Sequence, residues 1–272
     1  MPAAKRPVAS VSIVSPADIH EALRPPLDTA VLDELVPELS LAQGIQQGPY
    51  HHLDVRDHIL ETIRGVDRED QENRLEAKVS PDILPNLRVA ALLHDIAKPL
   101  TRGEFEGRVL FVAHDSLGAR LAHYICGRLG LSAACTDLAV TLTALHLKIG
   151  FMESSRSDHP PERLVRAAGP FGEELAVLCW SDRLAAQGPK LKEEHIERHR
   201  DLCSKFLKIY RGVEPSPEPD YKTLAKDLEL DIAADVGYAA SRVRALEARG
   251  LKTEEAIQSI RGLLPKTGLR SG

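Results

Sequence analysis

The sequence predicts a nearly all-α protein. Only 4% of the 272 residues are aromatic, and Val and Ile are scattered among Leu, Ala, Glu and Arg instead of alternating with polar residues, as they do in half-buried strands. Apolar residues recur at spacings of three and four, which is the period of an amphipathic helix. The chain is long enough to bury a sizeable core. We therefore expect a helical bundle.

The first predicted element is a flexible tail over residues 1–27, because prolines interleaved with Ser and Ala make this stretch poor material for a packed element. The helical pattern then runs over residues 28–211, the predicted bundle. Its apolar stripes include Val31, Leu32, Leu35 and Leu39, then Val55, Ile59 and Ile63, then Leu117, Leu121, Ile125 and Leu129.

A proline-rich stretch ends the predicted bundle. Residues 212–220 hold three prolines within five residues, which remove backbone donors and clash with preceding carbonyls, so they predict a linker. Residues 221–265 predict a C-terminal helical segment with helices over 221–249 and 253–264, and residues 266–272 predict a second flexible tail. Because the segment has few large apolar residues, we expect it to pack across the bundle rather than form its own core.

Charge and composition exclude two classes of protein. The net charge of −5 argues against a protein that coats nucleic acid through general electrostatics, so an RNA contact would be local. No apolar run approaches the ~20 residues that span a bilayer, and the N-terminus lacks the apolar core of a secretory signal. The four cysteines form no Cys-x-x-Cys pair, which suits buried reduced thiols and a cytoplasmic location.

Ionisable residues occupy positions where the helical pattern calls for apolar ones. An apolar helix ends in the pair His94-Asp95, and Pro99 is predicted to stop it. Asp182 follows Leu175 and Leu178 in an apolar run, where an unpaired carboxylate would be costly. Three further histidines lie on the core-facing stripes of other helices, namely His58, His114 and His146.

Four histidines and two aspartates from five helices, all directed inward, resemble the metal sites that helical bundles build in their cores. For each histidine alone, the alternative is a hydrogen-bonded core imidazole, and for Asp182 it is a buried salt bridge. The whole set favours a metal site.

Other histidines are predicted to lie outside this site. His195 and His199 have the i, i+4 spacing of two zinc ligands, but their charged neighbours favour a solvated helix face. His51 and His52 precede the first ligand helix and either hydrogen-bond near the site or belong to a loop. His123 is predicted to be structural.

The order of these residues resembles that of the HD-domain metal-dependent phosphohydrolase superfamily, which is named for its His-Asp pair. A more specific resemblance, over about residues 28–265, is to the HD-containing C-terminal half of bacterial CCA-adding tRNA nucleotidyltransferases. It rests on Leu35-Val-Pro-Glu-Leu39, Pro49-Tyr-His-His-Leu-Asp-Val-Arg-Asp-His58, Ala91-Leu-Leu-His-Asp-Ile-Ala-Lys-Pro99, Phe111-Val-Ala-His-Asp-Ser-Leu-Gly-Ala119, Ser181-Asp-Arg-Leu-Ala-Ala-Gln-Gly188 and, more loosely, Ala248-Arg-Gly-Leu-Lys-Thr-Glu-Glu-Ala256.

The resemblance implies an HD-domain helical bundle with one or two divalent metal ions, which could be Mn, Fe, Co, Ni, Zn or Mg. It assigns one ion to His58, His94, Asp95 and Asp182, and a second ion to Asp95, His114 and His146. Asp95 is then catalytic as the bridge between the ions. Lys98 is catalytic as a cation for the phosphate, with a surface lysine near a helix end as the alternative.

Two departures from the family pattern bear on the metal site and on the activity of the chain. Leu147 stands where many members have a second His or Asp, so we expect the second ion to be held more weakly. The sequence has no Gly-Ser dipeptide, the start of the motif that the nucleotidyltransferase head needs, so we expect no nucleotide addition by this chain.

The function implied is a metal-dependent phosphohydrolase, a phosphodiesterase or phosphatase, acting on nucleotides or RNA 3′ ends such as 2′,3′-cyclic phosphates. One alternative is a tRNA-binding partner of a separate nucleotidyltransferase with a structural metal, and another is a nucleotide phosphohydrolase with no RNA role. A tRNA contact through the C-terminal segment would use Arg242, Arg244 and Arg249, with a solvated helix face as the alternative.

Overall fold

The computed structural model describes residues 15–153, 160–213, 217–262 and 264. Over these residues the all-α prediction is confirmed, apart from one short hairpin. Of the predicted tails, residues 1–14 and 266–272 lie outside the described residues. The helices up to the predicted linker are α1 (Pro16–Ala22), α2 (Thr29–Leu35), α3 (Pro37–Ser40), α4 (Val55–Glu72), α5 (Leu84–Leu93), α6 (Lys98–Thr101), α7 (His114–Arg128), α8 (Ala133–Leu145), the 3-10 turn η1 (Ile149–Phe151), α9 (Pro161–Ala168), α10 (Gly172–Ala185) and α11 (Glu193–Arg211).

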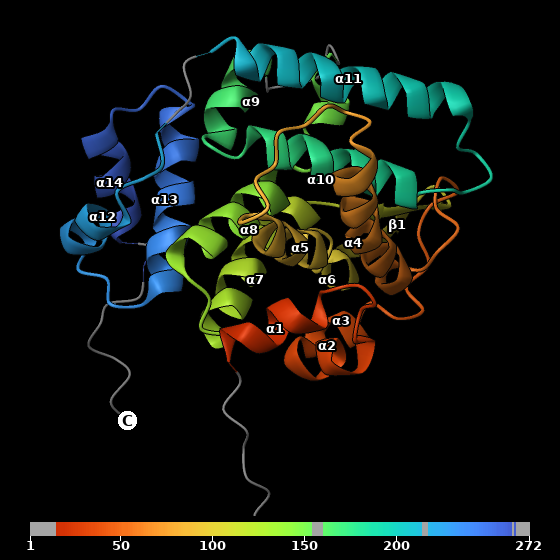
Figure 1. Cartoon of the computed structure of the whole chain (residues 1–272), viewed down its shortest axis with the longest axis horizontal. Helices are drawn as coiled ribbons and strands as arrows, with labels where there is room; N and C mark the ends of the chain where they lie inside the picture. The colour runs from red at the N-terminus through yellow and green to blue at the C-terminus, as the bar shows by residue number, and fades with distance from the viewer. Residues whose placement is uncertain (1–14, 154–159, 214–216, 263, 265–272) are drawn as a thin grey trace, which may run out of the picture.

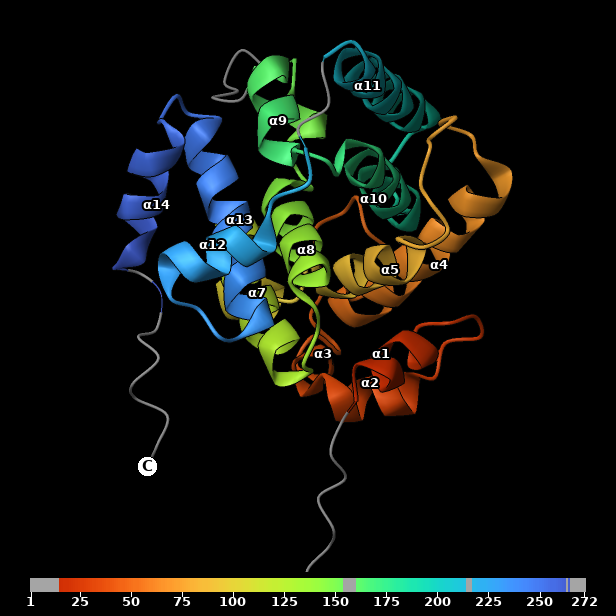
Figure 2. The same cartoon turned by 60° about the vertical axis from the view of Figure 1, so that its left-hand side comes forward.

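The centre of the bundle is built around α8, which packs against α5 and α7, and around α4, which packs against α5 and α10. In Figures 1 and 2, α11 lies along one side over α10, while α1 to α3 close the opposite side. Local sequence sets where the helices begin. Asp54 accepts a hydrogen bond from the amide of Asp57 at 2.8 Å and caps α4, and Ser132 caps α8 in the same way. None of the helices in the described ranges is long and apolar enough to cross a membrane.

The N-terminal prediction is wrong for α1, which is an ordered helix within the predicted tail. Ser15 caps it, and Pro16 occupies the first turn, where a missing amide hydrogen costs nothing. Ile19 and Leu23 are fully buried in the main core. The many prolines of this stretch led to the prediction of a tail, although its apolar residues have helical spacing.

A two-stranded antiparallel hairpin, which the sequence did not predict, connects α6 to α7. It consists of β1 (Arg102–Phe105) and β2 (Arg108–Phe111), with Arg102 opposite Phe111. Glu106 and Gly107 both have positive φ angles, of 49° and 69°, as the tight turns of two-residue hairpins require. The hairpin delivers the chain to His114, the first residue of α7.

The C-terminal segment contains three helices, α12 (Tyr221–Leu228), α13 (Ala233–Glu247) and α14 (Thr253–Arg261). The predicted single helix over 221–249 is therefore wrong, because the backbone turns left-handed at Glu229 and ends α12. Part of the predicted linker, residues 214–216, lies outside the described residues. As expected, the segment packs on the bundle, through α13 against α7 and α8. It also has a small apolar core of its own, which includes Leu228, Val236, Val243 and Ile260, so the expectation that it forms no separate core is wrong.

Arg244 joins the C-terminal segment to the bundle and is not available to RNA, so its predicted phosphate contact is wrong. Its guanidinium donates two hydrogen bonds to the Asp137 carboxylate in α8, at 3.1 and 2.5 Å, and the side chains are 8% and 0% exposed. Arg242 and Arg249 remain exposed. A contact of the segment with RNA remains a prediction for these two arginines.

The interface between α13 and α8 predicts a strong effect at Gly237. A Cβ atom at this position would lie 2.3 Å from the carbonyl oxygen of Ala133. This clash is with backbone, so relieving it requires one of the two helices to shift. We expect Gly237→Ala to lower the free energy of unfolding by about 1–3 kcal/mol in urea denaturation. Gly127→Ala in α7 is the matched control, since its Cβ would lie 3.5 Å from Ala234. It should leave stability unchanged or raise it by up to about 1 kcal/mol. Equal effects of the two variants would contradict the tight packing at Gly237.

Candidate metal centre

The His94-Asp95 pair lies directly after α5, in the turn that leads to α6. His94 is fully buried and Asp95 is 1% exposed. The predicted role of Pro99 as the stop of this helix is wrong, because α5 ends at Leu93 and Pro99 lies in the first turn of α6. Proline is tolerated there because the first turn needs no amide hydrogen. The turn carries Asp95 into the middle of the bundle.

The first group of side chains around Asp95 comes from α4 and α10. His58 Nε2 lies 2.8 Å from Asp182 Oδ1 and 3.5 Å from Asp95 Oδ2, and His94 Nε2 lies 3.2 Å from the same Asp95 oxygen. The two helices approach closely because a Cβ at Gly65 would meet the Ser181 Cβ at 3.0 Å. Small residues at the crossing thus bring His58 and Asp182 together.

The second group lies on the other side of Asp95. His114 Nε2 and His146 Nε2 lie 3.4 and 3.6 Å from Asp95 Oδ1. His114 begins α7 and His146 follows the end of α8. These helices cross closely at Gly118, where a Cβ would meet the Thr143 Cγ2 at 3.0 Å.

Three of the histidines are oriented by the backbone. The Nδ1 atoms of His94, His114 and His146 each lie 2.6–2.7 Å from the carbonyl oxygen three residues earlier. A carbonyl only accepts hydrogen bonds, so Nδ1 carries the proton and each Nε2 presents a lone pair. These three Nε2 atoms are buried and have no hydrogen-bond partner within the described part of the chain. Backbone orientation of this kind is typical of metal-binding histidines.

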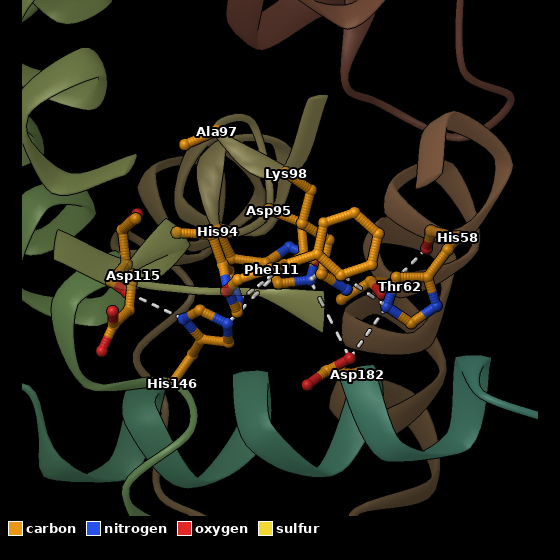
Figure 3. A network of polar contacts seen from close by, with 12 residues as sticks. His58, Thr62, His94, Asp95, Ala97, Lys98, Phe111, Asp115, His146 and Asp182 are labelled. Carbon is orange, nitrogen blue, oxygen red and sulfur yellow. Dashed lines mark hydrogen bonds and ion pairs between the residues drawn. The ribbon is translucent and has the colours of Figure 1, made fainter. Parts of the chain in front are cut away.

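The lone pairs of these histidines face the Asp95 carboxylate, which has no hydrogen atom to donate to them. Asp95 Oδ1 has no hydrogen-bond partner among the described residues, and the one donor beside Oδ2 is the Lys98 ammonium at 2.6 Å. Figure 3 shows His58, His94, Asp95, His146 and Asp182 directed toward a common centre. Buried orphan acceptors around one carboxylate fit a bound cation.

The ligand atoms form two overlapping groups, each with its atoms within 4.8 Å of one another. They are His58, His94, Asp95 and Asp182, and Asp95, His114 and His146. The structure thus brings together all six predicted ligands in the two predicted sets, with Asp95 shared. The donor set, imidazole nitrogen with carboxylate oxygen, suits Mn, Fe, Co, Ni or Zn.

The electrostatics of the centre keep both carboxylates charged. Burial alone would raise the pKa of Asp95, but the interactions with His94 and with the Lys98 ammonium outweigh it and hold this pKa well below its usual range. Burial acts in the same sense on Asp182, where the hydrogen bond with His58 outweighs it and holds the pKa well below its usual range. Burial lowers the pKa of His58. With neutral imidazoles, two carboxylates face one ammonium, that of Lys98, so the centre carries net negative charge and favours a bound cation.

Lys98 lies inside the site rather than on the surface. It is 7% exposed, and its Nζ lies 2.6 Å from Asp95 Oδ2 and donates to Gln47 Oε1 at 2.7 Å. Its Nζ also lies 5.4 Å from the centre of the Phe111 ring. The alternative of a surface lysine is wrong. Sequence reasoning missed Gln47, because no local pattern distinguishes it from other loop residues.

Two histidines before α4 line the outside of the first group. The ring of His51 lies 5.0 Å from the ring of His58, edge to face, and burial lowers the pKa of His51 to about 4. His52 Nδ1 accepts a hydrogen bond from the amide of Gln187 at 3.2 Å. His51 thus packs against the ring of His58, while His52 joins its loop to the end of α10.

The remaining histidines lie outside the metal centre, and one of them differs from its predicted environment. His123 is buried and lies 2.7 Å from Asp235 of α13, which confirms its structural role. His199 is 8% exposed and donates to the carbonyl oxygen of Cys179 at 3.1 Å, so its predicted place on a solvated face is wrong. His195 is partly exposed. The four cysteines are free and buried, as expected.

The site opens to solvent at Asp182. The side chain of Asp182 is 22% exposed, whereas those of His58, His94, Asp95 and His146 are at most 1% exposed.

Comparison with known proteins agrees with this geometry. Residues 57–187 match the family model of the HD domain. The chain contains an HD domain. All six residues of the centre lie within the matched interval, and HD domains bind divalent metal ions and form a superfamily of metal-dependent phosphohydrolases.

Several curated proteins share the HD-containing part of the chain. The CC-adding tRNA nucleotidyltransferase of Thermus thermophilus is 38% identical over 234 residues, which cover 81% of this chain and 47% of that protein. The A-adding tRNA nucleotidyltransferase of Deinococcus radiodurans is 35% identical over 165 residues, covering 60% and 35%. The bifunctional uridylyltransferase/uridylyl-removing enzyme of Nitrobacter winogradskyi is 30% identical over 155 residues, covering 54% and 16%. The HD-domain chain matches less than half the length of each of these relatives.

Proposed function

We propose that this HD-domain chain hydrolyses phosphate esters of nucleotides or RNA 3′ ends, such as 2′,3′-cyclic phosphates. The observation that carries the proposal is the position of Asp95, whose two oxygens face two separate groups of histidines. One carboxylate between two such groups suits a pair of divalent ions. A single structural ion would not need both.

Each residue of the centre has a proposed role in this reaction. His58, His94, Asp95 and Asp182 hold one divalent ion, and Asp95, His114 and His146 hold a second. Bound there, the ions would polarise the phosphate ester, lower the pKa of a water molecule and stabilise the leaving oxygen. Lys98 places a positive charge beside Asp95 and toward the phosphate. Gln47 holds the Lys98 ammonium in place through its hydrogen bond.

The relatives support both the reaction and the class of substrate. The name of the Nitrobacter winogradskyi enzyme includes the removal of a uridylyl group, which is the cleavage of a nucleotidyl bond. The names of the Thermus thermophilus and Deinococcus radiodurans enzymes give tRNA as the substrate. These names favour a nucleotide or RNA substrate for this chain.

An RNA-binding partner with a purely structural metal is the second candidate, and the site geometry disfavours it. Structural sites are closed by protein ligands on all sides. Here the Asp182 ligand is 22% exposed, and Lys98 lies beside Asp95 without being able to ligate a metal as an ammonium. An open site with a lysine beside the shared carboxylate suits a phosphate substrate.

Metal content is the first test of the proposal. We expect protein purified without a histidine tag to contain at least one equivalent of divalent metal by elemental analysis, since the buried carboxylates need positive charge. Hydrolysis of bis-p-nitrophenyl phosphate should be lost on chelation and restored by Mn. Protein with no metal that binds neither Mn nor Zn would refute the site assignment.

A further inference from the structure

The edge of the site beside Asp182, which we call the rim, has features that the proposed function leaves unused. It is formed by the loop around Tyr50 and by the end of α10 around Arg183. The loop is attached there by two backbone hydrogen bonds, from the amide of Gly188 to Tyr50 O at 2.9 Å and from the amide of Lys190 to Pro49 O at 3.0 Å. A Cβ at Gly188 would lie 2.4 Å from the carbonyl carbon of Tyr50, so the contact requires glycine.

Tyr50 is an aromatic side chain held at the mouth of the site. It is 45% exposed, although its backbone is fixed by Gly188. The next residue, His51, packs against the proposed ligand His58, and consecutive Cα atoms are only about 3.8 Å apart. One edge of the ring meets His195, with the ring centres 6.1 Å apart. An ordered, exposed aromatic ring is a surface on which a nucleobase can stack.

Arg183 forms no ion pair with any carboxylate among the described residues. It follows Asp182 directly in α10 and is partly buried, and its Nε is enclosed with no hydrogen-bond partner in the described part of the chain. Enclosing an unsatisfied charged group is unfavourable, and a guanidinium matches the geometry of phosphate oxygens.

The surroundings of Arg183 leave its charge available. The neighbouring His199 is buried, and burial followed by the charge of Arg183 lowers its pKa to about 4. His199 is therefore neutral near pH 7. Of these two neighbouring side chains, only Arg183 therefore carries a positive charge.

We infer that the rim is a nucleotide subsite, in which Tyr50 stacks on the base and Arg183 binds a second phosphate of the same substrate. This inference rests on the proposed phosphohydrolase function and specifies its substrate class. A nucleotide that carries one phosphate at the metal centre and another elsewhere on the chain, as an RNA 3′ end does, would use both contacts. A mononucleoside phosphate would use only the first.

Three phosphodiesters test the two contacts separately. Glycerol 1,2-cyclic phosphate has the reacting group alone, adenosine 2′,3′-cyclic phosphate adds the base, and its 5′-phosphorylated form adds the second phosphate. We expect Tyr50→Leu to raise KM about tenfold for both adenosine substrates and not for the glycerol substrate, with kcat little changed. Tyr50→Phe should retain the wild-type KM. We expect Arg183→Gln to remove a preference in kcat/KM of about tenfold for the 5′-phosphorylated substrate, and Arg183→Lys to keep part of it.

Matched controls are Tyr124→Leu and Arg200→Gln, both exposed and outside the rim. Tyr124 is ten residues beyond His114, about 15 Å along α7. Equal changes of KM for all three substrates in Tyr50→Leu would overturn the base contact, and an unchanged phosphate preference in Arg183→Gln would overturn the phosphate contact, while the proposed function stands. A wild-type protein that cleaves none of the three with Mn would overturn the proposed function together with the inference.

Discussion

Replacing Asp95 with asparagine is expected to lower phosphodiester hydrolysis more than about 100-fold, since substitutions outside the ligand sphere already cost about 10- to 100-fold. Asparagine keeps the size of the side chain and removes the charge that faces all four histidines of the centre. Both proposed ions lose their shared ligand. The measurement is kcat/KM with bis-p-nitrophenyl phosphate in excess Mn, together with metal content per chain.

Asp201→Asn is the matched control, because Asp201 is an exposed carboxylate of α11. It should retain wild-type activity and metal content. Asp95→Asn protein that unfolds at the wild-type temperature but retains wild-type hydrolysis would show that the reaction does not use the shared carboxylate. Retained metal with lost hydrolysis would restrict Asp95 to catalysis and contradict its role as the bridge.

Replacing Arg244 with methionine is expected to lower the free energy of unfolding by about 3–5 kcal/mol, the usual cost of removing one partner of a buried ion pair. Asp137 is fully buried and takes two hydrogen bonds from this guanidinium. Tyr221 and Thr141 each donate one more, at 3.1 and 3.2 Å, but both are neutral, so the charge of Asp137 would remain unpaired. Urea denaturation followed by circular dichroism measures the loss.

Arg242→Met is the control, since Arg242 is exposed on the same helix. It should change the free energy of unfolding by no more than about 0.5 kcal/mol. The double variant Arg244→Met with Asp137→Asn should be more stable than Arg244→Met alone, because it removes the stranded charge. Similar losses in Arg244→Met and Arg242→Met would show that the pair does not attach the C-terminal segment to α8.

The helical class and the residues of the centre could be predicted from the sequence because both depend on local pattern. Apolar spacing of three and four indicates which face of a helix is buried. His58, His114 and Asp182 were identified because they interrupt such faces. Asp182 in an apolar run implies a nearby cation whatever the fold around it.

The local sequence pattern does not show which helix faces pack against each other. The wrong predictions for His199 and Arg244 both have this cause. His195 and His199 have the same charged neighbours in sequence, yet only His199 is covered, because α10 packs against this side of α11. Arg244 looks like Arg242 in sequence, yet it lies opposite Asp137, more than 100 residues earlier. Long-range contacts of this kind have no local signature.

The sequence by itself determined that this chain is helical and that six ionisable residues point into its core. Only the tertiary structure decided that they converge on Asp95, that Lys98 and Gln47 belong to the site, and that the site opens at Asp182. The reason is that periodicity encodes the direction of a side chain relative to its own helix. The separation between side chains of different helices depends on how closely the helices cross, which Gly65 and Gly118 set here.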